Sequence, residues 1–144
     1  MTEDVNWAEM ADPGDYFVGH IGLVIDEATS GRVTGHLDIA PHHHQPYGIV
    51  HGGVYCSIIE TLASYGAAVT AHERTGNANV VGVSNATDFI RAHREGRLNA
   101  VAEPVHAGRT QHIWQVVITR DSDGKVVARG QVRLVSIQPE SIGG

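Results

Sequence analysis

The residues whose types and spacing could do chemistry are concentrated between positions 51 and 64. A His-Gly-Gly turn begins at His51, and Glu60 is the only carboxylate of the apolar run that follows before Glu73. Glycines at a helix start let a ligand approach the backbone closely, and the first N–H groups of a helix lack intrahelical acceptors and carry positive partial charge. The Gly52 N–H could therefore stabilise an oxygen that becomes negative during acyl transfer. The alternative is a turn selected only for its geometry.

Glu60 is the second chemical group of this stretch. A carboxylate on a buried helix is costly unless it is paired, so Glu60 is either catalytic or one half of a structural ion pair with an arginine. Ser64 lies four residues later on the same helix face, where it could hydrogen-bond Glu60 or simply permit close packing. Cys56 shares this face and is expected to be a core residue, because no basic neighbour in the helix would activate it.

The distance between the two groups decides how they could act together. Gly52 and Glu60 are eight residues apart, which is about 12 Å along an α-helix. A catalytic carboxylate and an oxyanion donor must both lie about 3 Å from one reacting group. One helix cannot easily supply both, whereas two antiparallel copies can. If Gly52 and Glu60 act on one substrate, their spacing therefore predicts a site shared across a homodimer.

Three adjacent histidines, His42 to His44, suggest a zinc site at first sight. Adjacent histidines in a loop rarely point at one metal ion, and the chain has no second cluster at ligand spacing. It also has no Walker loop, no G-x-S-x-G motif and no dinucleotide fingerprint. We therefore expect no metal site and no bound cofactor.

Composition and charge narrow the possible partners. The formal net charge of −6 over 144 residues argues against nucleic acid, because phosphate binding needs a basic face. No stretch approaches the roughly 18 apolar residues that span a bilayer, so we expect no membrane association. Residues 1–15 are acidic and lack the pattern of a signal peptide, and Cys56 is the only cysteine. These features predict a flexible N-terminal arm and a cytoplasmic protein.

The elements that must position these residues follow from hydrophobic periodicity and turn signals. Alternation predicts strands, and the apolar run after the His-Gly-Gly turn predicts one long buried helix, residues 54–73. The expected strands are residues 20–29, 32–40, 80–91, 97–108, 112–120 and 125–137. Strands segregated around one helix indicate an α+β domain, residues 16–138, in which a curved antiparallel sheet wraps around the central helix. Residues 139–144 would form a tail.

With these elements in place, the motifs resemble a known family. The segments QPYGIVHGGVYCSIIETLAS, VGVSNATDFIR, GRLNAVAEPVHAGRTQHIWQVVIT and DGKVVARGQVRL are similar to those of hotdog-fold acyl-CoA thioesterases. The group they resemble is PaaI-like and includes phenylacetyl-CoA and 4-hydroxybenzoyl-CoA thioesterases. The resemblance, over residues 15–137, implies a hotdog fold and hydrolysis of an acyl-CoA thioester to free acid and CoA. It also implies a homodimer, and a homotetramer formed from two dimers.

The resemblance implies roles for individual residues as well. The Gly52 N–H would polarise the thioester carbonyl, and Glu60 of the second subunit would be the nucleophile or the general base for water. Gln45 would orient the carbonyl or the water, and His51 would help to position the thioester. Ser64 matches a Ser or Thr found one turn after the carboxylate.

For the CoA nucleotide, the resemblance points to the Gly-Arg-Thr segment formed by Gly108, Arg109 and Thr110, with Arg91 as a second candidate. Some relatives carry a histidine in the strand around Phe89, where this chain reads TDFIR, so a preference for aryl groups does not carry over. The acyl group therefore stays open among aryl, short, medium and branched chains.

Two other functions are compatible with this fold class. One is a non-catalytic acyl-CoA sensor or binding module, although Glu60 favours catalysis and no segment of the sequence reads as DNA-binding. The other is a hotdog hydratase or dehydratase, but the Asp/His pair of those enzymes is not found in this sequence.

Overall fold

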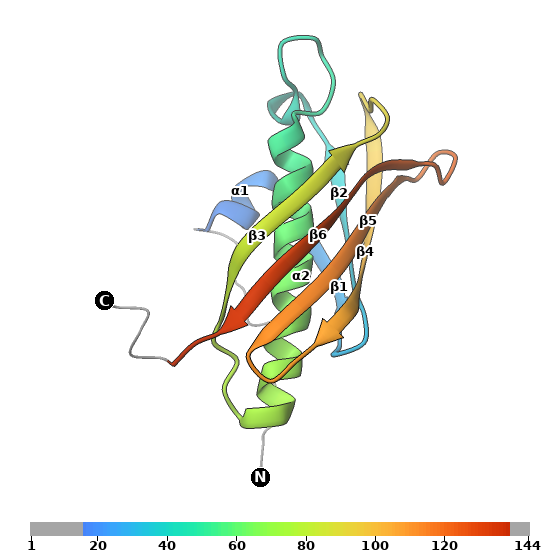
Figure 1. The fold of residues 1–144 in the computed structure, drawn as a ribbon. Coiled ribbons are helices and arrows are strands. Elements are labelled where there is room, and N and C mark those ends of the chain that lie inside the picture. The colour runs from blue at the N-terminus through green and yellow to red at the C-terminus, as the bar shows by residue number, and fades with distance from the viewer. Residues whose placement is uncertain (1–15, 139–144) are drawn as a thin grey trace.

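The computed structural model describes residues 16–138, which form a six-stranded antiparallel sheet wrapped around one long helix (Figure 1). The predicted arm, residues 1–15, and the predicted tail, residues 139–144, lie outside the described residues. In chain order the elements are α1 (Phe17–Ile21), β1 (Val24–Ala28), β2 (Val33–Ile39), the 3-10 turn η1 (Pro41–His43), α2 (Gly52–Thr75), β3 (Val80–Phe89), β4 (Gly96–Ala107), β5 (Gln111–Arg120) and β6 (Val126–Ser136). The α+β architecture with its curved sheet is therefore confirmed.

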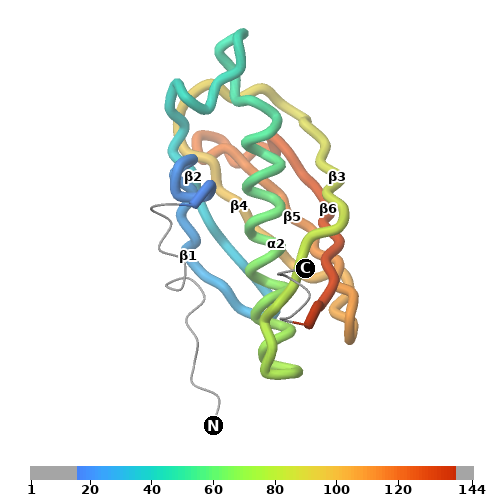
Figure 2. The backbone as a smooth tube through the Cα atoms, turned by 90° about the vertical axis from the view of Figure 1, so that its left-hand side faces the viewer, coloured from blue at the N-terminus to red at the C-terminus, as the bar shows by residue number. Residues whose placement is uncertain are grey.

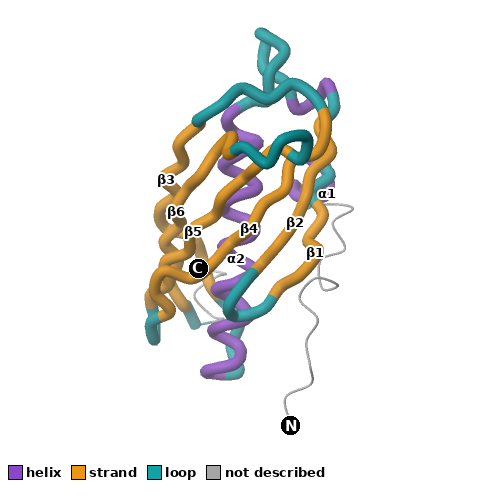
Figure 3. Tube along the Cα trace, turned by 90° about the vertical axis from the view of Figure 1, so that its right-hand side faces the viewer, coloured by secondary structure: helices purple, strands orange, loops and turns teal. Residues whose placement is uncertain are grey.

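The order of the strands in the sheet is β1-β2-β4-β5-β6-β3, and every neighbouring pair is antiparallel. The helix α2 crosses the concave face of this sheet, as Figures 2 and 3 show from two sides. The strand β3 follows α2 directly in the chain, pairs with β6 and lies at an edge of the sheet. Within the described residues, one side of β3 therefore has no neighbouring strand, which matters for the site described below.

Local sequence sets both ends of α2. His51 is the N-cap residue, and its Nδ1 accepts the Gly53 N–H at 2.8 Å. Gly76 ends the helix with φ of 74°, a left-handed conformation that glycine adopts without steric cost. The helix is thus slightly longer at each end than the predicted residues 54–73. Neither α2 nor any other helix in the described part of the chain is long and apolar enough to cross a bilayer.

The short helix α1 was not predicted from the sequence. The strand expected over residues 20–29 begins only at Val24, and the segment before it forms a helix of five residues. Gly22, with φ of 81°, ends this helix, and its N–H donates to the carbonyls of Val18 and Gly19. A helix of little more than one turn contains too few residues to show a helical period.

The core fills the space between α2 and the sheet. Ten of the 24 residues of α2 are buried, and Trp114 of β5 is fully buried against the helix. The Trp114 ring packs where α2 has no side chain, because a Cβ atom on Gly66 would lie 2.4 Å from that ring. Gly66 therefore sets how closely the helix can approach the sheet.

We expect Gly66→Ala to lower the free energy of unfolding by about 2 kcal/mol, because the extra methyl group overpacks a site from which Trp114 cannot retreat. Gly31→Ala is the matched control, since a Cβ atom there meets nothing within 4 Å. Urea unfolding of both variants measures the difference. Equal stabilities would show that the packing at Trp114 is not tight.

Candidate active site

A pocket of about 310 Å³ opens at the N-terminal end of α2 and collects three residues that the sequence had singled out. Gln45 comes from the loop after η1, Gly52 is the first residue of α2, and Arg91 follows the end of β3. The rest of the wall is aromatic and aliphatic and consists of Ile49, Val50, Tyr55, Phe89, Ile90 and Ala92. A mainly apolar pocket with a few convergent polar groups is typical of small-molecule sites.

The Gly52 N–H is available to a ligand in this pocket. Among the described residues nothing accepts a hydrogen bond from it, whereas the neighbouring Gly53 N–H is bonded to His51. The absence of a side chain brings Phe89 close, because a Cβ atom on Gly52 would lie 2.6 Å from the Phe89 Cζ. A donor at the start of a 24-residue helix combines an N–H group with the positive end of the helix dipole, as an oxyanion requires.

His51 acts on this donor through the backbone. Because its Nδ1 accepts a backbone N–H, the neutral imidazole carries its proton on Nε2. The side chain is exposed, and it orders the turn that presents the Gly52 N–H. The structure thus shows His51 as the N-cap of α2, next to the pocket.

Hydrogen bonds to a neighbouring loop fix the segment that carries Gln45. The Gln45 Oε1 accepts the Tyr47 N–H, so its NH₂ group is the part of the carboxamide that can serve a ligand. The Arg94 guanidinium donates to the carbonyls of Tyr47 and Gly48 at 3.2 and 3.3 Å, and the His44 ring contacts the Arg94 carbonyl at 2.6 Å. Sequence analysis missed Arg94, because its partners lie 47 and 46 residues away along the chain.

Glu60 does not line this pocket. It lies about 12 Å from Gly52 along the helix, and its carboxylate is beside β3, where a Cβ atom on Gly82 would be 3.7 Å from Oε1. The side chain is exposed, so the expectation that Glu60 lies on a buried part of the helix is wrong for the single protomer. Among the described residues, which include every arginine, Glu60 makes no ion pair. A structural salt bridge therefore does not explain it.

Two neighbours of Glu60 differ from expectation. The Ser64 hydroxyl donates to the Glu60 backbone carbonyl at 2.7 Å rather than to the carboxylate. Cys56 is half-buried rather than a core residue, and its carbonyl accepts the Asn85 Nδ2 at 3.1 Å. Asn85 was not predicted as a site residue, yet this bond ties the edge strand β3 to the turn of α2 that precedes Glu60.

The Gly108–Thr110 turn lies at the opposite end of the molecule from the pocket, as Figure 1 shows for the connection between β4 and β5. The Arg74 guanidinium, near the C-terminus of α2, donates to carbonyls at the start of this turn. Arg74 is 22 residues from Gly52, or about 33 Å along the helix. The turn and the pocket of one protomer therefore cannot hold opposite ends of one small ligand.

Arg91, the second candidate for the nucleotide, lies at the pocket. Its Nη1 donates to the Val126 carbonyl at 2.7 Å, and its side chain is otherwise exposed. The two candidate sets for CoA binding are thus at opposite ends of α2 within one chain.

The adjacent histidines have separate structural contacts. His43 is buried; its Nδ1 accepts the Ala40 N–H at 2.9 Å, and its Nε2 donates to the Ile21 carbonyl at 2.6 Å. His44 instead contacts the carbonyl of Arg94. In the described part of the chain, no three His, Cys, Asp or Glu side chains gather in a way that could hold a metal ion.

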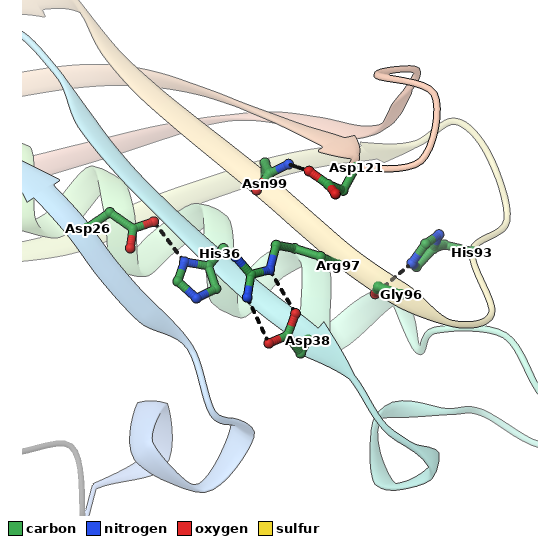
Figure 4. Close-up of polar contacts among 8 residues, drawn as sticks. All are labelled: Asp26, His36, Asp38, His93, Gly96, Arg97, Asn99 and Asp121. Atoms are coloured by element: carbon green, nitrogen blue, oxygen red, sulfur yellow. Dashed lines mark hydrogen bonds and ion pairs between the residues drawn. The ribbon is translucent and has the colours of Figure 1, made fainter.

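Polar side chains of β1, β2 and β4 also pair with one another (Figure 4). His36 pairs with Asp26 at 2.8 Å, and Arg97 forms two hydrogen bonds to Asp38, its cross-strand neighbour, at 2.8 and 3.1 Å. The hydrogen bond from Arg97 lowers the pKa of Asp38. These pairs lie at the surface and satisfy one another, so they support strand register and contribute little to stability.

Stability should fall as the pH drops below about 6.5 because of two buried histidines. Burial lowers the pKa of His43 and of His112, whose ordinary value is 6.5. The unfolded chain then binds protons more readily than the folded one, so this stability is present above pH 6.5 and is lost as the pH falls through the folded pKa values. Urea unfolding across this range checks the expectation. A flat profile, or one unchanged in His43→Gln/His112→Gln, would contradict it.

Comparison with known proteins agrees with this architecture. The sequence pattern of the thioesterase superfamily matches residues 47–127, more than half of the chain. Rv1847 of Mycobacterium tuberculosis, which is named only provisionally as an esterase, is 43% identical over 122 residues, covering 85% of this chain and 86% of that protein. The solved structure of that protein matches with a TM-score of 0.80 over 85% of this chain and 96% of the other.

Two further relatives have more specific names. The proofreading thioesterase EntH of Cronobacter sakazakii is 32% identical over 70% of this chain and 72% of its own length. A 1,4-dihydroxy-2-naphthoyl-CoA hydrolase of Listeria monocytogenes is 29% identical over 72% of this chain and 81% of its own length. The sheet wrapped around α2 is the hotdog fold of these proteins, and the chain belongs to the thioesterase superfamily.

Proposed function

We propose that this chain is an acyl-CoA thioesterase that acts as a homodimer and hydrolyses a thioester to free acid and CoA. One observation carries the proposal: the Gly52 N–H, which has no acceptor among residues 16–138, lies in an apolar pocket, and an exposed Glu60, which makes no ion pair within the same residues, lies about 12 Å away. The names of EntH and of the Listeria hydrolase support thioester chemistry. The reaction needs no cofactor beyond the CoA of the substrate, and the protein would work in the cytoplasm.

The edge strand β3 supports a homodimer. Its ten residues contain one charged side chain, Asp88, and its apolar side chains Val81 and Val83 are 39% and 50% exposed. An open edge with so few charges is a template for pairing with another strand. Antiparallel pairing of two β3 strands about a two-fold axis would set the two α2 helices antiparallel and place Glu60, beside Gly82, at the interface. Two such dimers would form the tetramer.

In a shared site each group has a distinct task. The Gly52 N–H donates to the thioester oxygen, and the Gln45 NH₂ group orients the carbonyl or the water. Glu60 of the second protomer either attacks the carbonyl carbon, giving an anhydride that water then hydrolyses, or removes a proton from attacking water. In both routes the C–S bond breaks, and CoA leaves as a thiolate that takes up a proton. Ser64 and His51 hold the backbone turns of the two reacting groups.

The nucleotide of CoA would then meet the second protomer. Suppose that Glu60 of the second protomer lies level with Gly52 of the first. Arg74 of the second protomer, further along the same helix as that Glu60, then lies about 21 Å beyond Gly52 of the first. The CoA arm from sulfur to the first phosphate has about 13 bonds and reaches about 16 Å when extended. The Gly108–Thr110 turn held by Arg74 would therefore contact the nucleotide from the protomer that also supplies Glu60. Arg91, at the pocket of the first protomer, would lie on the opposite side of the bound CoA arm.

Incubation with a panel of aryl, short, medium and branched acyl-CoAs tests the proposal, with released CoA measured by a thiol reagent. Release that depends on the enzyme supports hydrolysis. Tight binding of acyl-CoA without release would favour the non-catalytic binding module instead. Sedimentation of the same sample should show dimers or tetramers, and a monomer that hydrolyses thioesters would contradict the shared site.

A further inference from the structure

Tyr55 carries a buried hydroxyl group that nothing in the described protein satisfies. The residue is 3% exposed, and its Oη has no hydrogen-bond partner among the described residues. A buried hydroxyl without a partner is rare in native proteins, because it has lost its bonds to water and gained none. Such a group calls for an explanation, and the position of Tyr55 offers one.

Tyr55 forms part of the wall of the pocket that contains Gly52. Side chains of an α-helix lean toward its N-terminus, so the Tyr55 ring extends from α2 toward the end of the fold where this pocket opens. The ring lies 5.9 Å from that of Phe89, and the nearby walls are aliphatic. Burial raises the pKa of Tyr55 to about 12, so the phenol keeps its proton and is a donor at any working pH.

A second copy of the chain is not a suitable partner for this hydroxyl, since Tyr55 is already covered within one protomer. A small group that enters the pocket is suitable. Phe89 covers the route, because its ring rests against both Gly52 and Tyr55. In the single protomer that ring is 58% exposed at the end of the edge strand and lies outside the buried core, so its displacement would open the route without unpacking the core.

We propose that Tyr55 is a specificity-determining residue that donates a hydrogen bond to an oxygen atom within the acyl chain. The preferred substrates would be thioesters whose acyl group carries an ether, hydroxyl or carbonyl oxygen a few atoms beyond the thioester carbonyl. Gly52 and Tyr55 are three residues apart, or about 4.5 Å along the helix, so the two donors can hold one short acyl group between them. The inference rests on the proposed thioesterase function.

The test compares heptanoyl-CoA with its 4-oxa, 5-oxa and 6-oxa analogues, in which one methylene group is replaced by an ether oxygen. In the wild type, kcat/KM for the oxa analogue that fits should exceed that for heptanoyl-CoA by about ten-fold, because a hydrogen bond is formed with a buried donor. In Tyr55→Phe the order should reverse, because the ether oxygen is then buried without a partner. Tyr16→Phe, at a tyrosine that is 71% exposed, is the control and should behave as wild type.

Binding of non-cleavable thioether analogues of the same four compounds separates this inference from hydrolysis. Turnover with the same oxa-to-heptanoyl ratio in the wild type and in Tyr55→Phe would overturn the inference and leave the thioesterase proposal standing. Absence of turnover would reject hydrolysis. If the thioethers still bind, and the wild type but not Tyr55→Phe prefers the oxa analogues over the heptanoyl analogue, the donor role of Tyr55 is supported. Thermal unfolding of Tyr55→Phe should match or exceed that of the wild type, since the variant removes an unsatisfied group.

Discussion

Replacing Glu60 by glutamine should lower kcat by about 10²- to 10⁴-fold while binding of the CoA ester stays largely intact. The amide keeps the shape of the side chain but can neither attack a carbonyl nor accept a proton. Glu60 is exposed and makes no ion pair with the described residues, so its loss strands no buried charge and should not unfold the protein. Steady-state CoA release and calorimetric titration with a non-cleavable ester analogue give the two quantities.

The matched control for this variant is Glu73→Gln, which makes the same chemical change at an exposed position on the same helix. Its kcat should stay within about two-fold of the wild type, as is usual for surface substitutions away from a site. Turnover by Glu60→Gln near the wild-type rate would mean that Glu60 is neither nucleophile nor base. Similar losses in both variants would point to damage to α2 instead.

Local pattern was sufficient to predict most of the fold, because each strand and α2 have their own periodicity and turn signals. The sequence could not predict the order of the strands. Residues 80–89 follow α2 directly, yet they pair with residues 128–136 at the far edge of the sheet, and only long-range packing decides that. The helix α1 was missed because one turn shows no period.

The same limit explains the differences at the candidate site. The motif spacing correctly separated Gly52 from Glu60, because both lie on one helix of known rise. Whether Glu60 is buried depends on the edge position of β3, which local pattern does not contain. Nothing in the local pattern singled out Tyr55, and only the three-dimensional structure shows that its hydroxyl has no partner among the described residues.

A mixed dimer of two inactive variants should recover activity if the site is shared between chains. Glu60→Ala removes the carboxylate, and Gly52→Pro removes the N–H donor. Proline fits the first position of a helix, and His51, with φ of −64° and ψ of 135°, already has the conformation that precedes a proline. The new ring must displace Phe89, so Gly52→Ala, which adds the same Cβ atom but keeps the N–H, is the control for that clash.

Each homodimer should be inactive, whereas co-refolding of equal amounts should restore about a quarter of the wild-type activity. Half of the dimers are then mixed, and in each of them one site has both defects and the other has neither, since a two-fold axis makes two equivalent sites. The recovered rate should also rise and fall with the fraction of mixed dimers as the mixing ratio is varied. Properly folded mixed dimers that recover nothing would place Gly52 and Glu60 of one chain at one carbonyl. About 12 Å of helix between the two residues opposes that arrangement unless α2 itself breaks.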